Sequence, residues 1–386
     1  MISFSQFGND LYTGKRSINF VGRQKLWYAV SAAMLVLAAI GLFGRHLNLG
    51  LEFRGGSEFR VSSVTNLDNF EARGKDAIGT LRTGSDVVVT KINTDTVRVQ
   101  TEKFDNAQAD KAETALAKEF TVGENKISFS TVGASWGASV SQKALTALIV
   151  FLVLVSLVLA AYFRTWKMSL AALIALAHDL VITVGIYALA GFEVTPASVI
   201  GFLTILGYSL YDTVVVFDKV RENTTAAISS GRMSYSQAAN QAVNQTLVRS
   251  INTSVVALLP VGSILFIGFF LLGPGTLLDL SLALFIGIAV GTYSSIFIAT
   301  PVLADLRERE PAMQKLKKQA ERYQSTKGRQ VSEAASAGEP FDGDESIQDT
   351  VPVTAGSGTS AGGRTLHPYV QTGPRNQPKR PPKSKR

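Results

Sequence analysis

The stretch IVFLVLVSLVLAAYF, residues 149–163, contains no charged side chain and presents no polar face. Helices on the surface of soluble proteins alternate apolar and polar faces, so this pattern argues against a large soluble protein with buried helices. A helix of about 20 apolar residues spans the hydrocarbon core of a bilayer. The chain contains six apolar runs of this kind, and we predict transmembrane helices at Trp27–Phe43, Ala144–Phe163, Met168–Ala190, Pro196–Phe217, Ser250–Leu272 and Thr276–Leu303.

The composition of the remaining chain narrows the chemistry. The 386 residues include no cysteine, which excludes disulfides, thiolate chemistry and cysteine-ligated metals. The three histidines, His46, His178 and His367, are too scattered to indicate a metal centre. We also find no phosphate-binding loop and no nucleophile motif, so we expect neither an enzyme nor a cofactor. A cleaved signal peptide is not expected, because the first apolar run begins only after 26 residues.

Basic residues in the short connections predict the orientation. Lys and Arg precede the first run and occur in the connections 164–167 and 218–249, whereas 191–195 and 273–275 contain none. Short cytoplasmic loops are enriched in Lys and Arg. We therefore expect both termini in the cytoplasm and residues 44–143 outside.

This orientation divides the chain into five parts. They are a cytoplasmic N-terminal segment (1–26), the first transmembrane helix (27–43), an extracytoplasmic domain (44–143), transmembrane helices two to six (144–304) and a cytoplasmic tail (305–386).

The external segment has the pattern of a small α+β domain. Alternating, strand-like stretches and helix-like stretches follow one another, with a turn expected at 93–95 between two strands of a hairpin. The order β-α-β-β-α-β is typical of a ferredoxin-like fold with both helices on one face of the sheet. The stretches are 57–63, 67–82, 86–92, 96–102, 105–120 and 126–133.

The cytoplasmic tail is basic. We expect a helix to continue to about residue 324, and the Gly-, Ser-, Pro- and Lys-rich sequence beyond it is typical of disorder. Its charge is open to two interpretations, nucleic-acid binding or attraction to anionic lipid or ribosomal surfaces. A position beside the membrane favours the second, so we predict no nucleic-acid partner.

A carboxylate, Asp212, interrupts the fourth apolar run. Its burial near the bilayer centre costs about 2.5–3.5 kcal/mol. Gly201, Thr204, Tyr208 and Asp212 recur at helical spacing and share one face. Asp212 is either a packing carboxylate satisfied by neighbouring hydroxyls or a proton-carrying group, and the cost of its position favours the second interpretation.

Two further sites carry polar residues within the membrane. His178 and Asp179 lie near the middle of the third run, and because they point about 100° apart, at most one of them shares a given face fully. A satisfied structural histidine and a proton relay are equally open for His178. Arg249, at the start of the fifth run, either marks the membrane edge or pairs with Asp212 until the carboxylate is protonated.

The sixth run carries small residues at every fourth position. Such residues let helices approach closely. They predict a tightly packed seam against a neighbouring helix of this chain or of a partner, with Ile288 facing lipid. The seam consists of Ala283, Gly287, Gly291, Ser295 and Ala299.

Several stretches together resemble one family. They are GLEFRGGSEF (50–59), VGASWGASVSQKAL (132–145), ALAHD (175–179), GYSLYDTVVVFDKVREN (207–223), TLVRSINTS (246–254) and GTYSSIFIAT (291–300). They resemble the SecD/SecF family of bacterial preprotein-translocase subunits, within the resistance-nodulation-division superfamily, over residues 15–305.

The resemblance implies a SecF-type unit of the bacterial plasma membrane that pairs with SecD, attaches to the SecYEG channel and uses the proton-motive force to draw preproteins outward. Its partners would then include protons and membrane lipids. By matched position, Asp212 is the protonatable carboxylate and Arg249 the basic residue facing it. The family's G-I-D-F-x-G-G motif is matched at Gly50, Glu52, Phe53, Gly55 and Gly56, with Glu52 in place of Asp.

Two other functions remain open. One is half of a proton-driven small-molecule exporter of the resistance-nodulation-division type, although an external segment of only 100 residues (44–143) leaves little room for a substrate pocket. The other is a structural scaffold without proton coupling, which the polar position of Asp212 disfavours. Co-purification of SecD and the channel, or of an outer channel, would distinguish these functions.

Overall fold

The computed structural model describes residues 4–81, 87–92, 95–273 and 275–337. The described residues up to Gly328 form one compact unit, and a second unit begins at Arg329. In the described part of the chain, six helical segments are long and apolar enough to cross a membrane, which confirms the prediction of a multi-pass helical membrane protein. These segments are Val21–Arg45, Ala134–Phe163, Trp166–Ala190, Pro196–Ser230, Tyr235–Leu271 and Thr276–Glu308.

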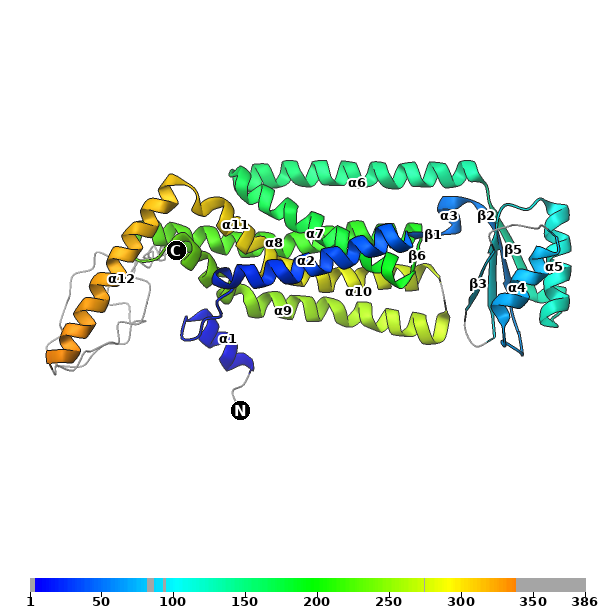
Figure 1. Ribbon diagram of the computed structural model, residues 1–386, viewed down its shortest axis with the longest axis horizontal. Helices are drawn as coiled ribbons and strands as arrows, with labels where there is room; N and C mark the ends of the chain where they lie inside the picture. Colours follow the sequence, from blue (N-terminus) through cyan, green and yellow to red (C-terminus); the bar gives the residue numbers. More distant parts are fainter. Residues whose placement is uncertain (1–3, 82–86, 93–94, 274, 338–386) are drawn as a thin grey trace, which may run out of the picture. The chain divides into compact units, whose positions relative to one another are not determined.

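Long helices running alongside one another build the bundle (Figure 1). Three of them continue into a π-helical turn, a form that is frequent at functional sites. The elements are α2 (Gln24–Ile40) with η2 (Gly41–Arg45), α6 (Ala134–Phe163), α7 (Trp166–Ala190), α8 (Pro196–Ser230), α9 (Tyr235–Ile267) with η4 (Gly268–Leu272), and α10 (Thr276–Ser294) with η5 (Ser295–Ala299) and α11 (Thr300–Glu308).

Local sequence explains where these helices begin and end. Thr195 and Ser198 form a capping box at the start of α8, and Pro196 occupies its first turn, where no backbone N–H is needed. The cap residue Gly231 ends the same helix with a φ of 65°, a conformation that glycine adopts without strain.

The connection 218–249, expected as a loop, is instead mostly helical. Helix α8 continues to Ser230 and α9 begins at Tyr235. These extensions are polar enough to escape a search for apolar runs, yet α9 buries small and apolar side chains there, including Ala238, Ala242 and Val243. Amphipathic packing therefore lengthens both helices beyond their apolar segments.

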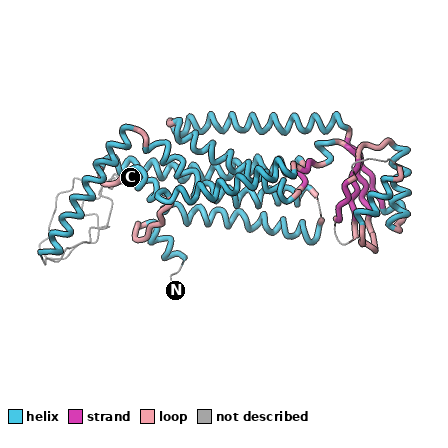
Figure 2. Tube along the Cα trace, viewed as in Figure 1, coloured by secondary structure: helices cyan, strands magenta, loops and turns pink. Residues whose placement is uncertain are grey.

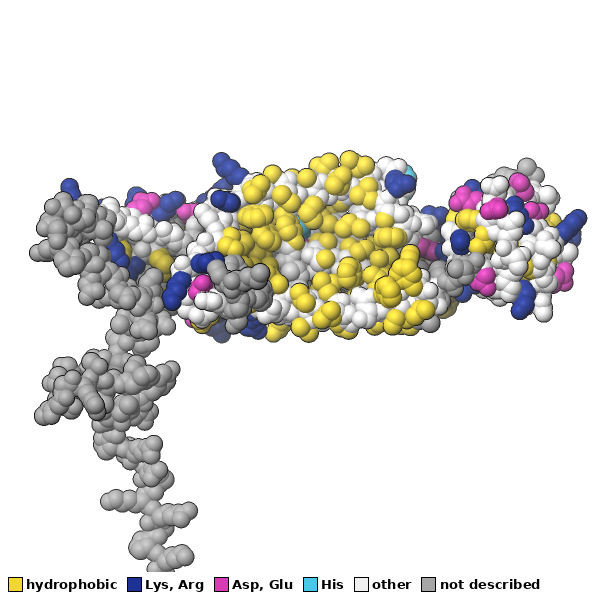
Figure 3. Space-filling model, turned by 90° about the horizontal axis from the view of Figure 1, so that it is seen from below, with side chains coloured by type: hydrophobic (Ala, Val, Ile, Leu, Met, Phe, Trp, Pro, Cys, Tyr) yellow, Lys and Arg dark blue, Asp and Glu magenta, His cyan; other side chains and the backbone are white. Residues whose placement is uncertain are grey.

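The helices differ in how much they bury. Few side chains of α6 are buried, and none of α9 after Ser254, whereas α7, α8, α10 and the first part of α9 contribute many buried residues. Figure 3 shows apolar side chains over a broad band of the bundle, with Lys and Arg gathered towards its ends. Leu157, Val256 and Leu271 are among the exposed apolar residues of the membrane segments, as expected where the solvent is lipid.

Residues 56–132 form a four-stranded antiparallel sheet with two helices. The strand order is β3-β4-β2-β5, and Figure 2 shows the strands side by side with helices on one side of them. Phe59, Val97 and Leu116 are fully buried between the layers. The elements are β2 (Gly56–Val61), α4 (Phe70–Gly79), β3 (Val88–Lys91), β4 (Val97–Thr101), α5 (Asn106–Phe120) and β5 (Ile127–Val132). Of the turn expected at 93–95, residues 93 and 94 lie outside the described residues.

Short elements flank this layer and the bundle. Strand β1 (Asn48–Leu49) pairs in parallel with β6 (Glu193–Val194), and the one-turn helix α3 (Leu51–Arg54) follows β1. At the chain's start, α1 (Phe4–Tyr12) precedes the short helix η1 (Val21–Arg23).

The helix expected to end near residue 324 is longer. Helix α12 (Pro311–Ala337) continues through residues 325–337, which include the helix-forming residues Gln330, Glu333 and Ala334. The helix therefore continues beyond residue 324 although the sequence has no periodic apolar face in that part. The expected disorder of 338–386 lies outside the described residues.

Candidate functional site

Asp212 lies where three helical segments meet. The side chain belongs to α8 and its residue is 8% exposed. Ser250 Oγ, from α9, donates to Oδ1 at 2.6 Å, and Ser295 Oγ, from η5, donates to Oδ2 at 2.5 Å. Each carboxylate oxygen thus accepts a hydroxyl proton, which offsets part of the cost of removing the charge from water. Hydroxyls both donate and accept, so the same serines can serve a protonated carboxyl group.

Close packing of α8 and α10 creates this site. A Cβ atom at Gly287 would collide with the Ile205 side chain, and one at Gly291 would lie 2.9 Å from the Ser209 Cβ. The structure therefore places the seam residues of α10 against α8, within this chain. All five are buried: Ala283, Gly287, Gly291, Ser295 and Ala299.

Ile288 was wrongly expected to face lipid. It is 4% exposed and packs in a cluster with Tyr187 and Phe202. The reason is that α10 contacts α7, α8 and α9, so neighbouring helices cover more of its circumference than the seam alone predicts. Ala289 is the exposed neighbour.

His178 and Asp179 are both buried, although they point in different directions. Asp179 Oδ2 accepts from Ser209 Oγ on α8 at 2.5 Å, and His178 Nε2 is hydrogen-bonded to Ser31 Oγ on α2. The two side chains also meet each other, with His178 Nδ1 and Asp179 Oδ1 3.2 Å apart. Because α7 lies between α2 and α8, each residue faces a different helix and neither is exposed.

The structure does not bring Arg249 to Asp212. Arg249 is exposed, and its Nη2 lies 3.4 Å from the Tyr211 hydroxyl, to which it donates. Within the described residues, serines provide both hydrogen bonds to Asp212. The residue that reaches the carboxylate is thus Ser250, one position after Arg249.

The polar face expected on α8 is divided between interior and surface. Gly201 and Asp212 are buried, whereas Thr204 is exposed and donates to the carbonyl of Ile200. Sequence reasoning missed Ser31, Ser209 and Ser250 as partners. Ser209 lies one turn before Asp212, which was a usable signal, but the contacts of Ser31 and Ser250 depend on how separate helices pack.

The glycines near residue 55 join the sheet to the bundle. Gly55 and Gly56 have φ values of 74° and 142°, and a Cβ at Gly56 would clash with the carbonyl oxygen of Thr101. Phe53 packs beside the bundle cluster, and the Gly50 amide donates to Val194 O at 2.9 Å. These residues form a compact connection that a side chain at Gly56 would disrupt.

An ion pair at the same end fixes β4 to β6. Arg98 Nη2 and Glu193 Oε2 are 2.6 Å apart, and both side chains are mostly buried. Glu52 lies nearby in a groove of about 850 Å³ that is also lined by Asp279 and Phe266. Among the described residues, no three His, Asp or Glu side chains are grouped to hold a metal ion.

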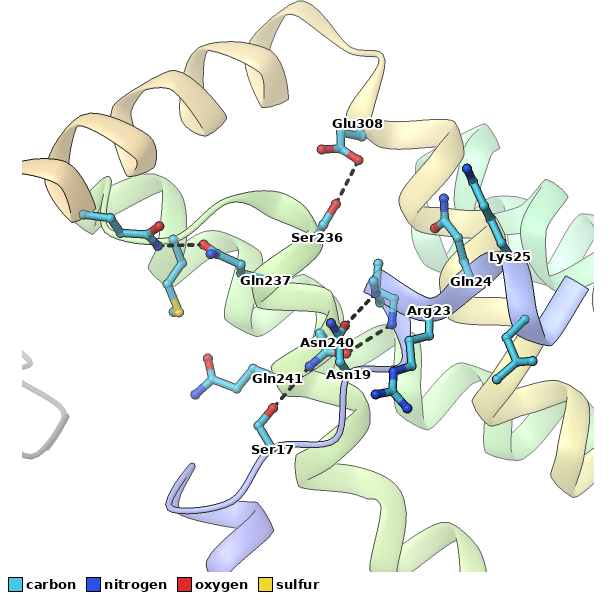
Figure 4. Close-up of a pocket in the computed structure, with 15 residues that line it drawn as sticks. Ser17, Asn19, Arg23, Gln24, Lys25, Ser236, Gln237, Asn240, Gln241 and Glu308 are labelled. Atoms are coloured by element: carbon cyan, nitrogen blue, oxygen red, sulfur yellow. Dashed lines mark hydrogen bonds between the residues drawn. The ribbon is translucent and has the colours of Figure 1, made fainter. Parts of the chain in front are cut away.

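A polar cavity of about 1010 Å³ lies at the other end, between the segment before α2 and the start of α9. Asn240 Oδ1 accepts from the backbone amides of Phe20 and Val21, and its Nδ2 donates to Ile18 O. Figure 4 shows Asn240 close to Ser17, whose hydroxyl also accepts from Nδ2. Asn240 thereby anchors the chain where it enters α2. Arg23 and Lys25 line the cavity.

Comparison with known proteins shows the family. The pattern described as "Protein export membrane protein SecD/SecF, C-terminal" matches residues 111–309, and the "SecD/SecF GG Motif" matches residues 40–65. The chain is 46% identical to "Protein translocase subunit SecF" of Streptomyces coelicolor, over 92% of this chain and 95% of that protein. It is 43% identical to the SecF subunit of Mycobacterium tuberculosis, over 78% of this chain and 70% of that protein.

A solved structure agrees with this assignment. The crystal structure of SecDF from Thermus thermophilus, described as a translocon-associated membrane protein, matches with a TM-score of 0.67 and 30% identity. The match covers 76% of this chain but only 39% of that longer chain. On these matches, the chain belongs to the SecF family of protein translocase subunits.

Proposed function

We propose that this subunit works without enzymatic activity, together with SecD, and uses the proton-motive force to promote passage of preproteins through SecYEG. The observation that carries the proposal is Asp212, a buried carboxylate held by hydroxyls from two other helical segments. The names of the relatives, protein translocase subunits, support a role in export and do not favour the small-molecule exporter.

Protonation of Asp212 would change the contacts among three segments. The ionised carboxylate accepts from Ser250 and Ser295 at the same time. A protonated carboxyl group must donate one hydrogen bond, so one serine has to turn and accept. One charge moved across 100 mV provides about 2.3 kcal/mol, enough to bias an element with two arrangements. The π-helical turn η5, which carries Ser295, is a suitable element to shift.

SecD is the proposed partner because the bundle surface carries polar groups that lipid cannot satisfy. Arg249 and Asn252 of α9 are exposed, and the hydrogen bond to the Tyr211 hydroxyl uses only one of the Arg249 donors. Unsatisfied polar groups are costly in hydrocarbon. A second helix bundle would cover them, and the SecDF relative combines both names in one chain. Arg249 then faces that partner, and its proposed part in proton coupling is through the interface with SecD and not through a pair with Asp212.

The external domain is proposed to have the ferredoxin-like fold and to lie outside the bacterial plasma membrane. Its element order and the strand order β3-β4-β2-β5 support the fold. The basic connections support the orientation, with both termini in the cytoplasm. The motif Gly50, Glu52, Phe53, Gly55 and Gly56 would transmit movements of the bundle to this domain, because it lies between them.

Replacement of Asp212 by Asn tests the proposal. The amide is nearly isosteric and cannot carry the proton, so Asp212→Asn should assemble with SecD but lose the stimulation of export by a proton gradient. Export is measured in membrane vesicles with and without an imposed gradient. Asp218→Asn is the matched control, because Asp218 is partly exposed and accepts from the Tyr162 hydroxyl at 2.6 Å. Full stimulation in Asp212→Asn at normal subunit levels would refute the proposal.

A further inference from the structure

A chain of hydrogen bonds crosses the bundle beside Asp212. It begins at Ser209 on α8, passes through Asp179 and His178 on α7, and ends at Ser31 on α2. Every member of this chain is buried. Polar side chains from three different helices are therefore connected at the depth of the membrane.

The chain ends at a cavity. Ser31 and His178 line a space of about 360 Å³, together with Tyr28 and apolar side chains such as Ile174 and Val181. Tyr28 donates to Asp305 Oδ2 at 2.8 Å, and Gln24 donates to the other Asp305 oxygen at 2.9 Å. Tyr28 thus connects the lining of the cavity, through Asp305, to Gln24, which lies between the basic residues Arg23 and Lys25 in the sequence.

The other end of the chain lies next to Asp212. Ser209 and Asp212 are three residues apart on α8, about 4.5 Å along its axis, and both face the interior. A water molecule between the two side chains would complete the link from the Asp212 carboxyl group to the Ser209 hydroxyl. Since Ser209 also packs against Gly291, one turn before Ser295, the two sets of hydrogen bonds share the α8–α10 interface.

We propose that Asp179 and His178 form the route by which a proton passes between Asp212 and the basic, inner end of the bundle; this rests on the proposed function of Asp212. The proton leaves the Asp212 carboxyl group and reaches the Asp179 carboxylate by way of the Ser209 hydroxyl. Asp179 passes a proton to His178 Nδ1, and Nε2 releases one to Ser31 and the cavity. Asp212 ends ionised, Asp179 and the imidazole return to their starting charge, and one proton has moved.

The surroundings of His178 suit this role. The titratable groups around it are Asp179 on its own helix, Tyr28 of α2, Asp305 of α11 beyond Tyr28, and Tyr293 of α10, whose ring stacks on the imidazole at 6.3 Å. The described lining of the cavity contains no Lys or Arg. A positive imidazolium thus faces carboxylates and aromatic rings, and no cation of that lining repels it.

The partners of the ring, and not their number, favour a relay. Any buried imidazole needs both nitrogens hydrogen-bonded, but here the partners are a carboxylate and a hydroxyl, which both exchange protons. One of these nitrogens also borders a cavity of otherwise mostly apolar lining. The arrangement links two proton-exchanging partners through one titratable ring, as a relay requires.

Chemical rescue of His178→Ala distinguishes the two roles. The intact complex with SecD and SecYEG is reconstituted in liposomes, and proton entry under an imposed potential is followed with a trapped pH-sensitive dye. A positioned proton-transfer group contributes about 10²–10⁴-fold, so we expect proton entry to fall by about 10² or more. Imidazole should restore it, because the enlarged cavity admits the ring. Pyrazole has the same size but is not basic near neutral pH, and should not restore it.

The remaining outcomes would contradict either the proton route or the proposed function of Asp212. Rescue by imidazole and pyrazole alike would show that His178 only fills space, and unchanged proton entry in His178→Ala would show that the route lies elsewhere. Ile174→Ala enlarges the same cavity without breaking the chain and should keep proton entry within about twofold, far below the expected relay effect. Asp212→Asn is measured in parallel. If it abolishes proton entry while His178→Ala does not, the route fails and the proposed function stands; if Asp212→Asn has no effect, the proposed function itself fails.

Discussion

The α/β domain (residues 56–132) and the α8–α10 interface are held together by opposite means. The domain core consists of large apolar side chains, with Phe59 and Leu116 fully buried between sheet and helices. In the α8–α10 interface, Gly287 and Gly291 bring the backbones close together, and Ser295, which directly follows α10, donates to the carboxylate of Asp212. The same chain thus packs large apolar side chains in the domain and glycines between α8 and α10.

The difference follows from the solvent. In water, burial of apolar area stabilises a fold by about 25 cal/mol per Å². Between helices in lipid this driving force is missing, so close approach and hydrogen bonds between helices have to stabilise the contact. A hydroxyl or carboxylate that would weaken the domain core therefore strengthens the interface, and the same groups are available for proton transfer.

The largest effect is expected where the interface is forced apart. Gly287→Leu with Gly291→Leu places bulky groups against Ile205 and Ser209, where even a Cβ atom does not fit. The protein should fail to accumulate, or should lose its hydrogen bonds at Asp212 and its association with SecD. Subunit abundance and co-purification with SecD measure this.

Ala289→Leu is the matched control on the same helix, because Ala289 is exposed. Normal abundance and normal SecD association in the double glycine variant would show that close approach of α8 and α10 is not what holds this interface.

Replacing a large side chain by a small one tests the core of the domain. Leu116→Ala removes a fully buried side chain from α5 and should destabilise the domain by about 2–5 kcal/mol. Hydrogen exchange of the intact protein should rise in β2 and β5, while α8 and α10 stay protected. Leu81→Ala, at an exposed position, should leave exchange unchanged. Equal loss of protection in the bundle would show that the two regions unfold as one.

The sequence predicted the elements better than the contacts among them. Apolar runs identify all six membrane segments, because a helix that faces lipid must be apolar over a fixed length. The same criterion ends α8 and starts α9 at the wrong residues, since their polar extensions bury one face, with residues such as Val220, Tyr235 and Leu247, and are not apolar all round.

The candidate site shows the same limit. Asp212 stands out because a carboxylate in an apolar run is costly, and the seam stands out by its period of four. Neither pattern states which helix lies opposite. Ser250 and Ser31 have ordinary surroundings in the sequence, and only the packing of α9 against α8 and of α2 against α7 brings them to Asp212 and His178.

Two serines allow a smaller, more direct comparison of the regions. Ser295 donates to the Asp212 carboxylate at 2.5 Å, and Ser57 accepts from the Phe104 amide at 2.9 Å in the domain. Hydrogen bonds to charged groups contribute about 1.5–3 kcal/mol, and those between neutral groups about 0.5–1.5 kcal/mol. Ser295→Ala should therefore cost more than Ser57→Ala, and it alone should change the pH at which proton-driven export is half-maximal.

Ser295→Thr keeps the hydroxyl and should retain more of the wild-type pH profile than Ser295→Ala. Equal pH profiles for Ser295→Ala and the wild type would mean that the Asp212 carboxylate does not depend on this hydroxyl.

The smallest effect is expected at a surface ion pair, which has neither a dry core nor a close helix contact. Lys317 of α12 donates to Glu308 at 2.9 Å, with half of its side chain exposed. The hydrogen bond to Glu308 and the attraction of its charge raise the pKa of Lys317 above its usual value of 10.5. A raised pKa in the folded state contributes stability below the unfolded-state value and loses it as the pH rises through the folded-state value. The contribution of the pair to the free energy of unfolding is therefore constant between about pH 6 and 9, and water screens it to a few tenths of a kcal/mol.

Lys317→Gln should leave thermal stability nearly unchanged across this range. A marked loss would show that α12 is held by this pair and not by its buried residues Met313 and Leu316.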